Sequence, residues 1–231
     1  MKLSNFWAFF DDAKLTEEIL INSSFQSIPN WNLEKLQRVC IEYRWLVKNH
    51  ANHLALLVSR LPESQFKCLI AEVLNDELGN GLYEKSHLVL WDNFLKSIGV
   101  EQIPARPHKI NEELFKPMSF LLINEPVDFI IGLEGVGVEC ICQVYLDLFR
   151  KHLVAHPFIK NNQSIDWEFW DIHTGGVDIA HKELIRKAVS ELIQSEKIDP
   201  DLVLKGYNNA KQLWRDFWAN FSEEKILQLN K

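Results

Sequence analysis

The chain has 231 residues, 47% of them hydrophobic, and a formal net charge of −7. Its 25 Lys and Arg are scattered among 32 Asp and Glu, which argues against nucleic acid as a partner because phosphate binding needs a concentrated basic surface. No uninterrupted apolar run is long enough to span a membrane, and Asp11 and Asp12 lie where a signal peptide needs apolar residues. We therefore expect one soluble domain over residues 1–231, located in the cytoplasm.

The four cysteines are Cys40, Cys68, Cys140 and Cys142, and they form no CxxC pair. This usage is typical of small core residues in a reducing compartment. Cys142 has no predicted histidine in a position to activate it, so a nucleophilic thiol is not favoured.

Apolar residues recur at helical spacing almost throughout the chain, and no alternating strand pattern is present. Gly, Pro and capping residues divide the chain into predicted helices at about 5–21, 32–60, 65–78, 82–98, 112–122, 127–153, 165–193 and 200–221, with a short terminal helix after them. The Gly175-Gly176 pair interrupts the helix over 165–193. Short loops between amphipathic helices predict an all-α antiparallel bundle, whose core can hold converging metal ligands.

The first candidate site segment contains Glu77, Glu84 and His87. On one continuous helix these three residues would lie within an arc of about 80°. Glu84-x-x-His87 has the spacing that lets a carboxylate and an imidazole meet one ion in di-iron bundles. The alternative is a solvated helix face that carries a few charges.

The second segment runs from Phe169 to His181 and contains His173 and Asp178. Asp178 and His181 share a helix face. His173 lies five residues before Asp178, about 140° away on a regular helix, and a one-residue bulge at Gly175-Gly176 would restore it to that face. Alternatively, His173 supports the site from outside or lies at the surface, and His181 is a core histidine bonded to backbone.

The third segment is the apolar stretch around Glu134 and Glu139. A carboxylate buried among apolar residues is costly unless it is paired or binds a cation. The two acids are five residues apart, so they would serve one site only if the helix were distorted. We prefer Glu134 as the ligand and keep Glu139 as the alternative.

Together these segments resemble the heme-oxygenase-like superfamily, which includes thiaminase II, pyrroloquinoline quinone synthase and non-heme di-iron oxidases and oxygenases. The resemblance covers residues 33–221 and is greatest to CADD-like proteins of the iron-containing redox enzyme group. In chain order, the metal-binding branch draws a Glu and a His from the segment that corresponds to Glu77–His87, then a Glu from the segment that corresponds to Glu134. It draws two His and an Asp from the segment that corresponds to His173–His181. This chain supplies those types in that order.

Two features depart from the family pattern. In the segment with two His and an Asp, family members usually have the first His four residues before the Asp, and here it lies five residues before the Asp. Many members also carry a carboxylate on the second helix, where this chain offers Glu42, His50 and His53. Of these three, His50 is our choice.

The resemblance implies an oxygen-activating enzyme with two Fe ions, or Mn as the alternative metal, since carboxylates and imidazoles suit both. The assignment is Glu77, His87, Glu134 and His181 around one ion, and Glu84, His173, Asp178 and a bridging Glu134 around the other.

The partners implied are dioxygen and a small amino acid, amine or fatty acid, and the superfamily often forms homodimers. Tyr83 and Tyr145 are expected to be buried near the metals, where they could be oxidised. The alternatives are a metal-free acid–base enzyme of the same fold and a non-catalytic binding protein.

Overall fold

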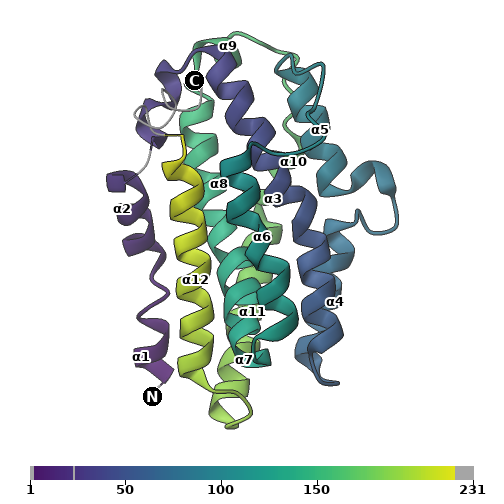
Figure 1. The fold of residues 1–231 in the computed structure, drawn as a ribbon, viewed down its shortest axis with the longest axis vertical. Coiled ribbons are helices and arrows are strands. Elements are labelled where there is room, and N and C mark those ends of the chain that lie inside the picture. Colours follow the sequence, from purple (N-terminus) through teal and green to yellow (C-terminus); the bar gives the residue numbers. More distant parts are fainter. Residues whose placement is uncertain (1–2, 23, 222–231) are drawn as a thin grey trace.

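The computed structural model describes residues 3–22 and 24–221. Over these ranges the fold is all-α and contains no strand, as predicted (Figure 1). The α-helices are α1 (Leu3–Trp7), α2 (Asp12–Asn22), α3 (Leu33–Arg60), α4 (Gln65–Glu77), α5 (His87–Ser97), α6 (Lys109–Asn124), α7 (Val127–Ile130), α8 (Cys140–Leu153), α9 (Pro157–Lys160), α10 (Glu168–His173), α11 (Gly176–Gln194) and α12 (Pro200–Ala219). Two 3₁₀ turns, η1 (Phe25–Asn30) and η2 (Tyr83–Lys85), and a π-helical segment, η3 (Ile131–Glu139), complete the set.

The predicted helix over residues 32–60 is confirmed as α3, the 28-residue helix that contributes to both the core and the site. It begins where the side chain of Asn32 accepts a hydrogen bond from the backbone N–H of Lys35 at 2.8 Å, which satisfies a free donor of the first turn. Its buried side carries Tyr43 and His53 as well as aliphatic residues. The helix therefore places polar groups inside the bundle.

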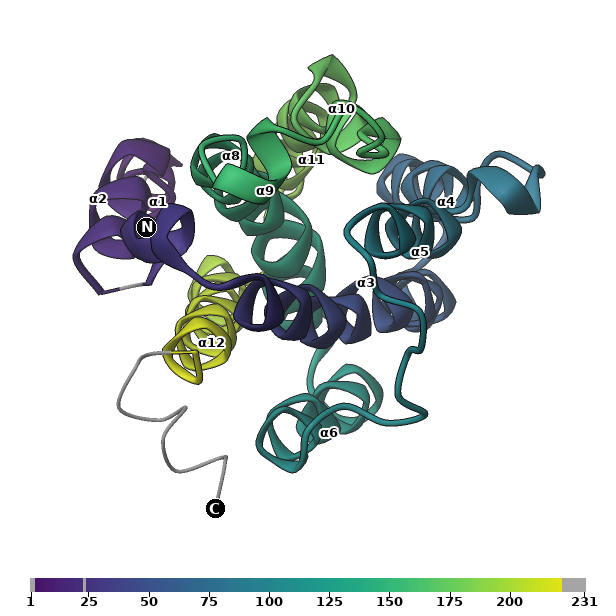
Figure 2. The ribbon, with the colours of Figure 1, turned by 90° about the horizontal axis from the view of Figure 1, so that it is seen from above.

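The predicted helix over residues 127–153 is one continuous helical stretch, but the nine residues of η3, between α7 and α8, are π-helical. In the view along the bundle, this stretch lies near the middle of the other helices (Figure 2). A β-carbon on Gly132 would lie 1.9 Å from the backbone oxygen of Val203 in α12, and one on Gly206 would lie 2.0 Å from that of Phe129. Glycine on both helices thus allows backbone contact between α12 and η3.

By length and composition alone, Val127–Leu153 could cross a membrane, but most of it is buried inside the fold, as in the core helix of a bundle.

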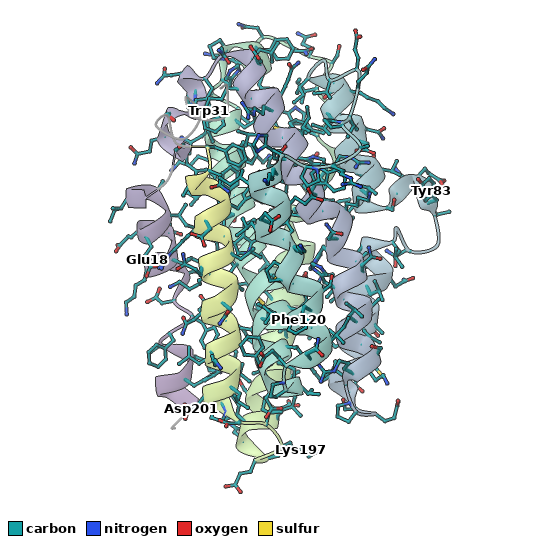
Figure 3. All side chains as sticks on the ribbon, viewed as in Figure 1. Glu18, Trp31, Tyr83, Phe120, Lys197 and Asp201 are labelled. Atoms are coloured by element: carbon teal, nitrogen blue, oxygen red, sulfur yellow. The ribbon has the colours of Figure 1, made fainter. Side chains whose placement is uncertain are left out.

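The segment between α4 and α5 is a loop, so the predicted helix over residues 82–98 begins only at His87. Gly79, Asn80 and Gly81 have φ angles of 82°, 54° and 85°. Three consecutive residues in this left-handed region end α4, because a right-handed helix needs negative φ. At the tip of the loop, Tyr83 points away from the bundle (Figure 3).

Two other helix boundaries differ from the prediction. Residues 5–21 are not one helix, because the carboxylate of Asp11 accepts hydrogen bonds from the backbone N–H groups of Ala13 and Lys14 and starts α2. The glycine pair separates α10 from α11 as a break, not as the bulge that the site prediction required. The predicted terminal helix after Phe221 lies outside the described residues.

The remaining long helix, α12, begins at the predicted Asp199-Pro200 signal. The side chain of Asp199 accepts a hydrogen bond from the backbone N–H of Asp201 at 2.9 Å, and Pro200 occupies the first turn. Its buried side carries Tyr207, Trp214 and Trp218. These rings pack into a single hydrophobic core with the aromatic residues of the other helices.

Substitution of Gly132 by Ala is expected to destabilise the fold, because the added methyl group would overlap the backbone oxygen of Val203. We expect a loss of about 1–3 kcal/mol or more in the free energy of unfolding. The matched control is Gly135→Ala, where the nearest atom would lie 3.7 Å from the new methyl group and the substitution should be neutral or stabilising. Urea denaturation measures both, and equal losses in the two variants would contradict the proposed backbone contact.

Candidate metal centre

His50 on α3 lies between two acids of η3. Its Nδ1 is 2.9 Å from Oε1 of Glu134, and its Nε2 is 2.7 Å from Oε2 of Glu139 and 3.9 Å from Oε1 of Glu77. Burial alone would lower the pKa of His50, but the three carboxylates outweigh it and raise that pKa well above its ordinary value. His50 therefore carries both ring protons and donates one to each acid of η3.

The π-helical geometry of η3 explains why Glu134 and Glu139 reach the same imidazole. Residues five apart in an α-helix point about 140° away from each other, whereas the i→i+5 repeat of a π-helix brings them closer to one face. The alternatives in the sequence prediction are thus not exclusive. Glu134 and Glu139 both contact His50, and Glu134 is fully buried.

A second set of contacts forms at three helix ends. Glu77 is the last residue of α4, His87 the first of α5 and His173 the last of α10. Oε1 of Glu77 lies 2.8 Å from Nδ1 of His87, and the rings of His87 and His173 are 4.4 Å apart. That Nδ1 atom is buried without hydrogen-bond geometry to any partner. A carboxylate oxygen and an imidazole nitrogen at this ion-pair distance could also point at a common metal position.

The protonation of this set suits metal binding. Burial and the charge of His87 hold the pKa of His173 at about 3, so its ring is neutral at neutral pH. Nδ1 of His173 donates to the backbone oxygen of Phe169 at 2.7 Å, which leaves the lone pair on Nε2. Burial tends to raise the pKa of Glu77, but His87 and His50 lower it to about 2, so Glu77 is an anion.

The structure places His181 of α11 at the edge of these contacts. Nε2 of His181 lies 3.0 Å from Oδ2 of Asp76, and its Nδ1 lies 3.9 Å from Oε1 of Glu139. Asp76 is the neighbour of Glu77 and was not singled out from the sequence. His181 and Asp76 therefore border the centre beside Glu139.

Two overlapping groups of side chains could each hold a metal ion. In each group, one ligand atom per residue lies within 4.8 Å of the others. The groups are Glu77 with His87 and His173, and Glu77 with His50 and Glu139. Glu134 adds a second indication of fit, because its buried Oε2 atom has no hydrogen-bond partner. We call these six residues, Glu77, His87, His173, His50, Glu139 and Glu134, the acid–histidine cluster.

Three residues predicted at the site lie elsewhere. Glu84 is exposed on η2, because the loop after α4 breaks the continuous helix that its assignment required. Tyr83 is 78% exposed, so the expectation that it is buried is wrong. Tyr145 is buried as expected, but its ring stacks on Trp214 and Trp218 and lines a different pocket. The side chain of Asp178 lies outside the described residues.

Of the three candidates on α3, only His50 and His53 are near the cluster. Glu42 accepts hydrogen bonds from the backbone N–H of His108 and the side chain of Asn111, and so joins α3 to the start of α6. His53 lies 3.9 Å from Glu134. The sequence signal for His50 is its helical spacing. Tyr43 lies two helical turns before His50, on the same side of α3.

A narrow pocket opens beside the cluster. Its polar lining includes His50, Glu77, Glu139 and His173, and its remaining walls are Tyr43, Leu46, Val47, Val138, Cys142, Phe169 and Trp214. The cavity between these side chains has a volume of about 30 Å³ and opens toward solvent. A small organic molecule that entered by moving these side chains apart would lie with one end against the cluster and the rest against apolar side chains.

Comparison with known proteins identifies the family and the fold. The sequence pattern of a family described as iron-containing redox enzymes matches residues 37–215. No curated protein sequence matches significantly. Among solved structures, a CADD-like protein of unknown function from Nostoc punctiforme superposes with a TM-score of 0.74 at 18% identity, covering 95% of this chain and 99% of its own. A domain of unknown function with a heme oxygenase-like fold, from Shewanella denitrificans, gives 0.73 at 18% identity, with coverage of 94% and 91%. The fold is therefore heme oxygenase-like, as predicted.

The buried neutral state of His173 predicts acid sensitivity of the metal-free protein. The pKa of His173 is about 3 in the fold and 6.5 as its ordinary value, so the unfolded chain binds more protons between these limits. Stability from this residue is complete above pH 6.5 and declines as the pH falls toward 3, by up to about 1.4 kcal/mol per pH unit. Denaturant titrations at several pH values in this range should show a smaller change in the free energy of unfolding per pH unit for His173→Gln than for the unaltered protein. An equal pH dependence in the two proteins would contradict the burial of a neutral imidazole.

Proposed function

Because the chain belongs to the family of iron-containing redox enzymes, we propose that it is a non-heme iron oxidase or oxygenase that uses dioxygen to oxidise a small organic molecule. The bound metal would supply electrons to dioxygen and open coordination positions for it. The fold and the acid–histidine cluster would supply the ligands, the pocket and the exclusion of water.

The observation that carries this proposal is the sharing of Glu77 by the two ligand groups. A carboxylate has two oxygens and can contact two ions at once. With Glu77 between them, His87 and His173 would hold one iron ion, while Glu139 and His50, once His50 has lost its Nε2 proton, would hold a second. This arrangement differs from the sequence prediction, in which Glu134 was the bridge.

The protein side chains would perform distinct tasks around the metals. Glu77 is already ionised and His173 already presents a neutral nitrogen, so neither needs to lose a proton before it binds a cation. The carbonyl of Phe169 would fix the orientation of the His173 ring. Glu134, which contacts His50, and the Asp76–His181 pair, which lies beside Glu139, would orient ligands or complete the coordination.

The pocket favours a substrate with a slim apolar body, because aliphatic and aromatic side chains form most of its walls. Among the described residues that line it, none is Lys or Arg, and the cationic His50 is already paired with Glu134 and Glu139. A charged end of the substrate would therefore lie against the bound metal ions, whose charge would offset that of the carboxylates.

The metal-free acid–base alternative is less well supported by the same residues. A general acid or base works best when its pKa is near the working pH. The pKa of Glu77 is about 2 and that of His173 about 3, so neither group would exchange protons efficiently near neutrality. These values suit ligands better than proton-transfer groups.

Replacement of Glu77 by Gln tests the shared ligand. Under anaerobic conditions the unaltered protein is expected to bind two ferrous ions per chain and to consume dioxygen on exposure to air. Glu77→Gln should weaken ferrous binding at both positions by at least about tenfold, because the amide has lost the charge that both ions share. Elemental analysis after gel filtration measures the iron retained, and an oxygen electrode measures uptake.

The matched control is Glu84→Gln, which makes the same chemical change at an exposed residue of η2. This variant should retain both iron and dioxygen uptake. Full iron retention in Glu77→Gln, or no iron bound by the unaltered protein, would contradict the proposal.

A further inference from the structure

Tyr43 and Cys142 face each other across the pocket beside the acid–histidine cluster. The hydroxyl oxygen of Tyr43 lies 3.4 Å from Sγ of Cys142, and either atom can be the donor. Tyr43 comes from α3 and is 1% exposed, while Cys142 comes from the first turn of α8 and is partly buried. The two most readily oxidised side-chain types in the pocket are therefore in contact.

Both residues have a short connection along their helices to the cluster. Tyr43 lies two turns before His50 on α3, and Cys142 lies about one turn after Glu139. All four line the same pocket. An oxidant generated at the cluster would thus meet Tyr43 and Cys142 without crossing the protein interior.

The other cysteines and tyrosines lack this combination. Cys40 and Cys140 are fully buried in the core, where burial raises the thiol pKa, to about 12 for Cys140, and Cys68 is exposed at the surface. Tyr145 is buried against tryptophan rings in another pocket. Only the Tyr43–Cys142 pair, among the described residues, joins a phenol to a thiol at the cluster.

We propose that Tyr43 and Cys142 are a modification site, at which dioxygen activated at the cluster joins them by a thioether bond between Sγ and a ring carbon next to the hydroxyl-bearing carbon. This inference rests on the proposed function, because dioxygen at the metal centre is the oxidant. The carbon beside the hydroxyl is the ring position at which an oxidised phenol forms new bonds, and it is adjacent to the group that Sγ contacts.

The reaction balances with one dioxygen molecule. One ring C–H bond and the S–H bond break, one C–S bond forms, and the two electrons and two protons released reduce dioxygen to hydrogen peroxide. The product chain has lost two hydrogen atoms. The bond would tie α3 to α8 across the pocket and would protect Cys142 from stepwise oxidation to sulfenic and sulfinic acids.

The test uses the full chain, loaded with Fe(II) without oxygen and then exposed to dioxygen with no organic substrate. After denaturation, thiol alkylation and proteolysis, mass spectrometry should find the peptides of Tyr43 and Cys142 joined, with two hydrogen atoms missing. Tyr43→Phe and Cys142→Ser should each abolish the joined peptide. Tyr145→Phe and Cys68→Ser, which change the same residue types away from the cluster, should retain it.

Iron content and dioxygen uptake are measured on the same samples, so that failure of this inference is distinguishable from failure of the proposed function. A chain that binds iron and consumes dioxygen but yields Tyr43 and Cys142 on separate peptides would overturn the cross-link alone. A chain that binds no iron would overturn both. Thermal unfolding of Tyr43→Phe verifies that the variant folds, since it keeps the buried ring and loses only the hydroxyl.

Discussion

The concentration of negative charge in the middle of an apolar bundle is the constraint on which the rest of this structure depends. Glu77, Glu134 and Glu139 lie within a few ångströms of one imidazole, and Glu134 is fully buried. Buried carboxylates need a positive charge or several hydrogen-bond donors beside them. In the protein alone the imidazolium of His50 meets that need in part, and a bound cation would meet it more completely. The same buried charges therefore form the site and limit the stability of the core.

The backbone geometry around the cluster follows from this constraint. A regular α-helix would send Glu134 and Glu139 in different directions, and the π-helical η3 lets both acids reach His50. Packing against α12 supports this π-helical geometry, because glycines allow α12 to contact the backbone of η3. Local irregularity at the site is therefore held by tight packing elsewhere.

Helical periodicity and capping residues were sufficient to predict the all-α fold, α3, the stretch from α7 to α8, and the start of α12. The sequence also predicted Glu77 and His87 from helical spacing, Glu134 because a carboxylate in an apolar segment is costly without a partner, and His173 from the family resemblance. It did not predict that Glu84 is exposed, because three consecutive residues with positive φ interrupt the continuous helix on which Glu84 was expected to share a face with His87. The π-helical segment was equally hidden, because nothing in a five-residue spacing reveals which helix type will form. His50 was the residue chosen on α3 from the sequence, whereas the place of Tyr43 in the pocket emerged only when tertiary packing placed α3 against η3.

The position of Glu77 and His87 at facing helix ends has a consequence for protein engineering. Because α4 and α5 hold these side chains, the chain between them serves mainly as a connection, and its tip at Tyr83 projects into solvent. Loop tips of this kind accept inserted sequence at low cost. A fluorophore or a short affinity peptide grafted there would lie between Glu77 and His87 in sequence and outside the bundle in space.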